Sequence, residues 1–151
     1  IEWIEKKRPT LLGLLSGIVG GLVAITPAAG FVDPKGAFMI GLIGGPACYA
    51  GAVWLKHALK YDDSLDAFGI HGVGGIVGAI LTGVFATATI NGVAEGADVI
   101  KQIVGLAAVI AWSAIGTFLV LMICRFTTGL RVARDGEVEG LDYSQHGESI
   151  Q

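Results

Sequence analysis

Four long stretches without a charged residue constrain the fold of this chain more than any other feature. They cover residues 9–32, 36–55, 67–94 and 102–124, and the third contains one ionisable group, His71. A helix of about 20 residues crosses the roughly 30 Å hydrocarbon core of a bilayer. Closed β-barrels need short alternating segments instead. The sequence therefore predicts an all-α, polytopic membrane protein built as a transmembrane helix bundle in a lipid bilayer.

The overall composition agrees with lipid as the surrounding solvent. Charged residues make up 15% of the chain, whereas soluble domains average roughly 25%. The net charge of −3 gives no indication of nucleic-acid binding. Cys48 and Cys124 lie in apolar runs, and we interpret them as small packing residues rather than as a disulfide or a metal site. We see no nucleophile–base pair and no metal-ligand spacing, so we expect no enzyme, cofactor or metal.

Polar residues and prolines mark the predicted helix boundaries. Thr10 is placed to cap the first helix, the run Asp62-Asp63-Ser64 precedes the third, and Pro46 predicts a kink in the second. The opening IEWIEKKRP predicts an earlier helix that began upstream, and thus a longer protein or a separate N-terminal half. We expect the end of that helix and a cytoplasmic loop at 1–9, helices at about 10–30, 35–58, 64–90 and 98–126, and a tail at 127–151.

Lysine and arginine are distributed unequally between the two predicted sides of the membrane. The side that holds the 127–151 tail carries eight of them, whereas the opposite side carries only Lys35 and Lys101. Loops rich in lysine and arginine face the cytoplasm. We therefore expect an integral protein of the plasma (cell inner) membrane with a cytoplasmic C-terminus.

Glycines four residues apart predict how the helices meet. Three GxxxG pairs occur within the apolar runs, and small residues at this spacing let two helix backbones approach closely. The alternative is that glycine is merely common in membrane helices. The pairs are Gly17/Gly21, Gly41/Gly45 and Gly74/Gly78.

His71 is the main candidate for chemistry. An ionisable side chain at membrane depth is costly, so it should face a cavity or a partner rather than lipid. On a regular helix Ala67, Gly74 and Gly75 share its face, which predicts a narrow slot of small residues with one imidazole. An imidazole can both donate and accept hydrogen bonds to a small solute. The alternative is a histidine that hydrogen-bonds a neighbouring helix for packing.

Two other polar positions have more than one interpretation. Asp66 could cap the third helix, pair with a cytoplasmic arginine or shape a pore mouth, and capping is the favoured reading. The Thr26-Pro27 step frees backbone carbonyls, which fits pore lining and simple helix termination equally well.

The tail is too polar to insert into the membrane. Leu130, Val132 and Leu141 could dock it on the cytoplasmic face, whereas the alternative is a disordered terminus. The charged residues that could pair with loop charges are Arg131, Glu137, Glu139 and Asp142.

Three segments of the chain resemble the ammonium transporter family (Amt/Mep/Rh), and the Amt branch most closely. They are ITPAAGFVDPKGAFMIG at 25–41, DDSLDAFGIHGVGGIVG at 62–78 and GLRV…EGLD…HGE at 129–148. The resemblance implies an eleven-helix subunit, built as an inverted repeat of two five-helix halves and assembled as a homotrimer with one pore per subunit. This chain would hold the last four helices and the tail, with residues 1–5 ending the seventh helix.

The resemblance also implies roles for individual residues. His71 would be the second member of a twin-histidine pair that conducts ammonium or ammonia, with Ala67 and Phe68 beside it and Thr26 near the pore wall. The first histidine belongs to the N-terminal helices, so this chain alone is not expected to transport. An ammonium sensor or regulatory subunit and an unrelated membrane scaffold remain alternatives.

The tail, by the same resemblance, is a regulatory segment that contacts a neighbouring subunit. In plant members a hydroxyl residue in this part is a phosphorylation switch, and Ser144 stands near that position. Nitrogen-signalling regulators of the P-II class dock on the cytoplasmic face of prokaryotic members. The tail residues carried by the match are Gly129, Arg131, Glu139, Gly140, Asp142, Ser144, His146, Gly147 and Glu148.

Overall fold

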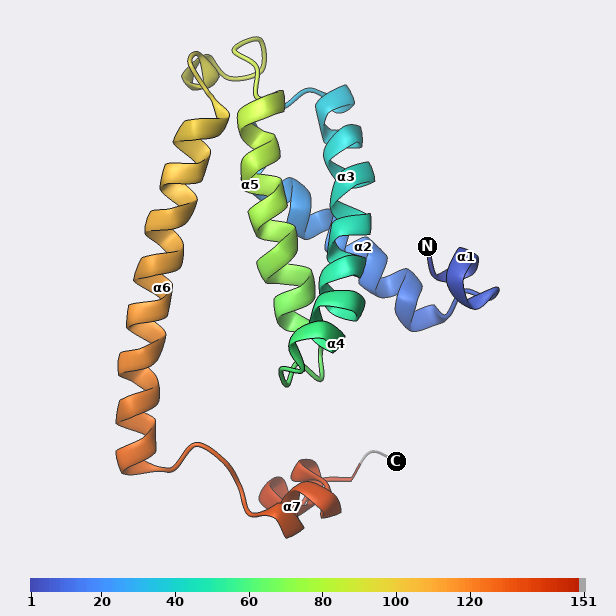
Figure 1. The fold of residues 1–151 in the computed structure, drawn as a ribbon, viewed down its shortest axis with the longest axis vertical. Coiled ribbons are helices and arrows are strands. Elements are labelled where there is room, and N and C mark those ends of the chain that lie inside the picture. Colours follow the sequence, from blue (N-terminus) through green and yellow to red (C-terminus); the bar gives the residue numbers. More distant parts are fainter. Residues whose placement is uncertain (150–151) are drawn as a thin grey trace. The chain divides into compact units, whose positions relative to one another are not determined.

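The computed structural model describes residues 1–149, which form helices joined by loops, with no β-strand in that range (Figure 1). The last two residues of the predicted tail lie outside the described part. The η elements are short 3₁₀ turns (η1, η4) or π turns (η2, η3, η5). In chain order the elements are α1 Glu2–Lys6, α2 Leu11–Ile25, η1 Thr26–Ala28, α3 Pro34–Tyr49, η2 Ala50–Leu55, α4 Lys56–Leu59, η3 Phe68–Gly72, α5 Val73–Phe85, η4 Gly92–Ala94, α6 Val99–Thr127, α7 Arg134–Glu139 and η5 Asp142–His146.

Four segments are long and apolar enough to cross a membrane, which confirms the predicted fold class. They are Leu11–Ala28, Pro34–Leu59, Phe68–Phe85 and Val99–Thr127. Three of them begin and end within two residues of the predicted 10–30, 35–58 and 98–126. The chain divides into two compact units, Ile1–Ala108 and the remainder from Val109 onward, with α6 continuing from the first into the second.

Side-chain caps explain where several helices begin. The Thr10 hydroxyl accepts a hydrogen bond from the Gly13 N–H at 3.0 Å, as its position predicts. Asp33 does the same for α3, accepting from the Gly36 N–H at 2.7 Å, with Pro34 in the first helical position. These oxygens satisfy N–H groups that have no partner within the helix.

The third predicted helix, 64–90, is wrong at both ends. Asp66 has a left-handed backbone with φ of 55°, which ends any helix that would start at 64. At the other end Ala86 is extended and forms an isolated bridge with Val32, while the Thr87 N–H donates to the Phe31 carbonyl at 2.8 Å. Pairing with the loop before α3 therefore ends α5 at Phe85.

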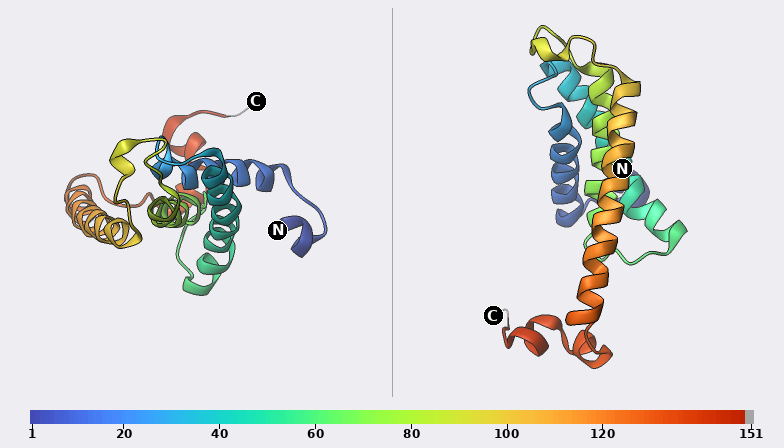
Figure 2. Two further views of the ribbon diagram at one scale, coloured as in Figure 1. Left: turned by 90° about the horizontal axis from the view of Figure 1, so that it is seen from above. Right: turned by 90° about the vertical axis from the view of Figure 1, so that its left-hand side faces the viewer.

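The first unit is centred on α2, α3 and α5, and α2 crosses the other two at a steep tilt (Figures 1 and 2). Each helix buries residues spaced four apart: Gly20 and Ala24 on α2, Gly44 and Cys48 on α3, Gly78 and Thr82 on α5. Ala24, Ala28 and Ile40 are completely buried and form the core.

This packing corrects two of the three predicted glycine pairs. A Cβ placed on Gly17, Gly21, Gly41 or Gly45 would meet nothing within 4 Å, so those glycines make no close helix contact in the described chain. The close approaches occur at Gly20 and Gly44 instead, while Gly74 and Gly78 lie at close approaches as predicted. Alanine and cysteine complete the small-residue ladders on α2 and α3, because any small side chain permits close packing.

Candidate functional site

His71 lies in η3, the π turn that leads into α5, and its side chain is exposed. Ala67 and Phe68 are exposed beside it, whereas Gly69 and Ile70 are buried. The imidazole forms no hydrogen bond within residues 1–149, so no partner helix in this range holds it for packing. The open face leaves the imidazole accessible to a solute or to another helix.

The predicted slot around His71 is only partly right. Gly74 does not share its face, since a Cβ there would meet the Cys48 Sγ at 2.8 Å and the Val23 side chain at 3.2 Å. Gly75 is open, with nothing within 4 Å. The cause is the π turn, in which the Val73 N–H reaches back five residues to the Phe68 carbonyl. This spacing shifts the face that a regular helix would present.

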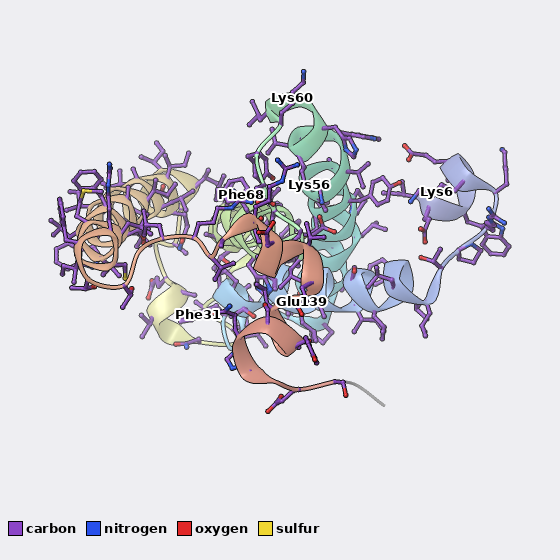
Figure 3. The ribbon with its side chains drawn as sticks, turned by 90° about the horizontal axis from the view of Figure 1, so that it is seen from below. Lys6, Phe31, Lys56, Lys60, Phe68 and Glu139 are labelled. Carbon is purple, nitrogen blue, oxygen red and sulfur yellow. The ribbon has the colours of Figure 1, made fainter. Side chains whose placement is uncertain are left out.

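The Phe68 ring is held by its neighbours at the start of η3. It packs edge-on against Tyr61 at 5.7 Å between ring centroids, with an interplanar angle of 90°. Gly72 leaves room for it, because a Cβ there would come within 2.7 Å of the ring. Phe68 is labelled with Lys56 in Figure 3.

The loop before η3 is fastened by Asp63 and Lys56. The Asp63 carboxylate accepts from the N–H groups of Ala67 at 2.7 Å, Phe68 at 3.0 Å and Gly69 at 3.3 Å. The favoured interpretation of Asp66 as the cap is therefore wrong. Its carboxylate pairs with the Lys56 ammonium group, which also donates to the Asp63 carbonyl at 3.0 Å. Asp63 can reach these three N–H groups because it lies four residues before Ala67, so the intervening loop can fold its carboxylate back over the start of the helix.

His71 lines neither of two surface hollows found in the first unit. One of about 460 Å³ lies over the loop after α4 and is lined by Lys56, His57, Lys60, Tyr61, Asp62, Asp63 and Ser64. The other, of about 310 Å³, is lined by residues that include Pro27, Phe31, Thr82, Glu95 and Asp98.

Thr26 is exposed, and its hydroxyl donates to the Leu22 carbonyl at 2.6 Å. The next residue, Pro27, lines the same hollow as Thr82. Because Thr82 follows His71 by eleven residues, the two are about 16 Å apart along the helix axis. The chain therefore does not bring Thr26 together with His71, and the local hydrogen bond fits its reading as a helix end.

The second unit ends in the short helix α7 and the π turn η5, which tail residues join. Ser144 is half-buried, and its hydroxyl donates to the Gly136 carbonyl at 3.1 Å. Three of the matched glycines have positive φ angles, Gly129 at 84°, Gly140 at 101° and Gly147 at 66°, a region that favours glycine. The Glu148 N–H donates to the Asp142 carbonyl at 3.0 Å, while His146 and Glu139 lie on the exposed surface.

Glu137 forms its ion pair with Arg131, within the tail. The Arg131 guanidinium donates to both of its carboxylate oxygens, at 2.5 and 3.1 Å. Such two-point pairing is the strongest form of an arginine–carboxylate contact.

The Arg131–Glu137 pair predicts a pH dependence for the tail. The guanidinium holds the pKa of Glu137 below its usual value of 4.5. A lowered folded-state pKa means that the pair stabilises the tail at pH values above 4.5, and that this contribution is lost as the pH falls through the lowered value. We expect Glu137→Gln to remove this dependence, measured by NMR of a peptide spanning 127–151, and Glu139→Gln to leave it unchanged. Identical acid titrations of the Glu137→Gln and native peptides would contradict the pairing.

Comparison with known proteins identifies the fold on which this site is built. The model of the Ammonium Transporter Family matches residues 1–150. The chain belongs to the ammonium transporter family. The ammonium transporter of Bacillus subtilis is 47% identical over 98% of this chain, and that of Aquifex aeolicus is 48% identical over 97%.

Solved structures of family members share the fold. The crystal structure of Saccharomyces cerevisiae Mep2 superposes with a TM-score of 0.76 at 38% identity, covering 89% of this chain and 33% of that one. A structure described as a sensor Amt protein gives a TM-score of 0.82 at 28% identity, covering 95% and 36%. The chain spans 38% of the length of the Bacillus relative and 36% of the Aquifex relative.

Sequence reasoning missed two residues, Lys56 and Gly69, that hold the segment around His71. In the sequence Lys56 is one of eight charges on the predicted cytoplasmic side, yet in the structure its ammonium group fixes the loop that leads to His71. Gly69 does not belong to a GxxxG pair, but it packs against the Ala52 backbone. The available signal was its position five residues before Gly74, a spacing that brings two residues to one face only in a π turn.

Proposed function

We propose that this chain forms the C-terminal part of an ammonium transporter subunit and that His71 lines the conducting pore. The observation that carries the proposal is an exposed imidazole, without a hydrogen bond in residues 1–149, on an apolar membrane helix of this family. An imidazole offers one ring nitrogen as a donor and the other as an acceptor. It can therefore pass a small hydrogen-bonding solute without a fixed charge on the wall.

The remainder of the pore comes from N-terminal helices, one of which supplies the partner histidine. Support for missing neighbours comes from α6, whose 29 residues include none that is buried in the described chain. An apolar helix of this kind needs lipid or other helices around it. The subunit forms a homotrimer in the plasma membrane with its tail in the cytoplasm, which agrees with the eight-to-two distribution of lysine and arginine.

The tail regulates transport through contacts with a neighbouring subunit. In cells that have a P-II-class regulator, the tail also contacts that regulator. The Ser144 hydroxyl is the donor that joins η5 to α7, so phosphorylation there would remove the donor and add charge. Transport is favoured over sensing because the Bacillus and Aquifex relatives, at 47% and 48% identity, are both described as ammonium transporters. The sensor Amt protein is 28% identical.

Uptake of labelled methylammonium by cells that lack their own ammonium transporters tests this function. We expect the complete protein to take up methylammonium and added ammonium to compete, because both present an N–H donor to the imidazoles. The 151-residue chain expressed alone is the matched control and should transport none, since it holds one histidine of the pair. Absence of uptake with normal membrane insertion of the complete protein would contradict transport, and ammonium binding in that case would favour the sensor.

A further inference from the structure

The π turn η3 changes which residues of the third span face the neighbouring helices. Gly74 and Gly78 pack closely against α2 and α3, and the next buried glycine toward the N-terminus is Gly69. In a regular α-helix the residues one turn before Gly74 would be Ile70 and His71, at the i−4 and i−3 positions. One extra residue in the turn rotates the preceding segment by about 100°. Gly69 thereby joins the buried Ile70 on the packed face, and His71 stays on the open face.

Close backbone contacts hold this rotation in place. The chain contains a second π turn, η2, directly opposite the first. A Cβ on Gly69 would come within 2.5 Å of the Ala52 backbone, and a Cβ on Gly51 would come within 2.8 Å of the Gly69 carbonyl oxygen. Neither contact can relax by moving a flexible side chain, because the opposing atoms belong to the main chain.

The N-terminal end of η3 is fixed as well. Asp63 binds three successive N–H groups, from Ala67 to Gly69. Asp62, the preceding residue, carries the same charge but forms no hydrogen bond through its side chain in residues 1–149. The carboxylate of Asp63 thus anchors the first turn, and the Lys56–Asp66 pair holds the loop that presents it.

We propose that the interlocked π turns η2 and η3 position His71, with Gly69 and Asp63 as the positioning residues. Neither residue touches the solute. Gly69 sets the rotation of the turn and Asp63 fixes its start, so that the imidazole points away from α2 and α3. This positioning role rests on the proposed function, because the open face of His71 becomes a pore wall only in the complete transporter.

Thiol labelling at position 71 tests this geometry without relying on transport. The complete protein with His71→Cys is treated with 2-aminoethyl methanethiosulfonate, and mass spectrometry follows the labelling rate. The protein with His71 intact reports the native cysteines. Adding Gly69→Ala should slow labelling by about tenfold or more, because the thiol turns toward the packed helices. Adding Gly75→Ala, where a Cβ meets nothing within 4 Å, should change it by less than about twofold.

Each result decides the proposal. Equal labelling with and without Gly69→Ala would overturn it, and so would a His71→Cys protein that is not labelled at all. If Gly69→Ala yields only aggregated protein, Asp63→Ala is used with Asp62→Ala as its control, and labelling slowed only by Asp63→Ala supports positioning. A failed pore hypothesis is recognised separately, since His71→Ala would then transport normally while labelling still depends on Gly69.

Discussion

Replacing Gly78 with leucine is expected to separate α2 from α5 and to lower the yield of folded protein severely. Gly78 is buried, and a Cβ there would collide with the carbonyl oxygen of Ala24 and lie 3.1 Å from its Cα. Ala24 is itself completely buried, so α2 cannot give way without opening the core. Overpacking a well-packed interior costs about 1–3 kcal/mol and sometimes more, and a clash with backbone belongs at the upper end. Thermal unfolding of the complete protein in detergent measures the loss.

Gly21→Leu is the matched control for this prediction. It adds a leucine to α2, the helix that Gly78 of α5 contacts, but nothing lies within 4 Å of a Cβ at Gly21. We expect its midpoint of unfolding to stay well above that of Gly78→Leu. The reverse order would show that the GxxxG pair Gly17/Gly21 carries the tighter contact in the complete protein. A Gly78→Leu protein with the same midpoint of thermal unfolding as the unmodified protein would contradict the packing described for α5.

The features that follow from length and local chemistry could be predicted from the sequence. A membrane span requires a long apolar run, so four uncharged stretches were enough to predict four spans and the helical class. A cap requires only a polar side chain at the right offset from the first free N–H, and Thr10 meets that condition. Both predictions are independent of which helices pack against each other.

The features that depend on neighbouring helices could not be predicted in this way. The GxxxG rule names glycines, but close packing accepts any small residue, and Ala24 and Cys48 serve on α2 and α3. The π turn η3 depends on the close contact between Gly69 and the Ala52 backbone. These residues are 17 positions apart, so no local sequence pattern predicts the contact. His71 is exposed in the described chain, and its role stays a prediction, while Gly74 does not share its helix face as the regular spacing suggested.

Replacing His71 with alanine is expected to reduce transport by the complete protein about ten- to a hundredfold while leaving its stability unchanged. A hydrogen bond to a charged group contributes about 1.5–3 kcal/mol, and each 1.4 kcal/mol corresponds to a factor of ten. Stability should not fall, because the proposed pore leaves the imidazole facing an open passage and no hydrogen bond holds it within residues 1–149. Substitutions at such positions usually change the free energy of unfolding by less than about 0.5 kcal/mol. Methylammonium uptake and thermal unfolding are measured on the same preparation.

The combination of the two measurements separates the roles left open for this residue. His57→Ala is the control, since His57 lies in α4, where its Nδ1 contacts the Val53 carbonyl oxygen, and we expect this variant to transport normally. Lost transport with native stability in His71→Ala is the result that a pore imidazole requires. A fall in the unfolding temperature together with lost uptake would instead make His71 a packing residue, bound by a helix beyond residues 1–149. Normal uptake and normal stability would remove His71 from both roles, because neither a conducting nor a packing imidazole can be deleted without effect.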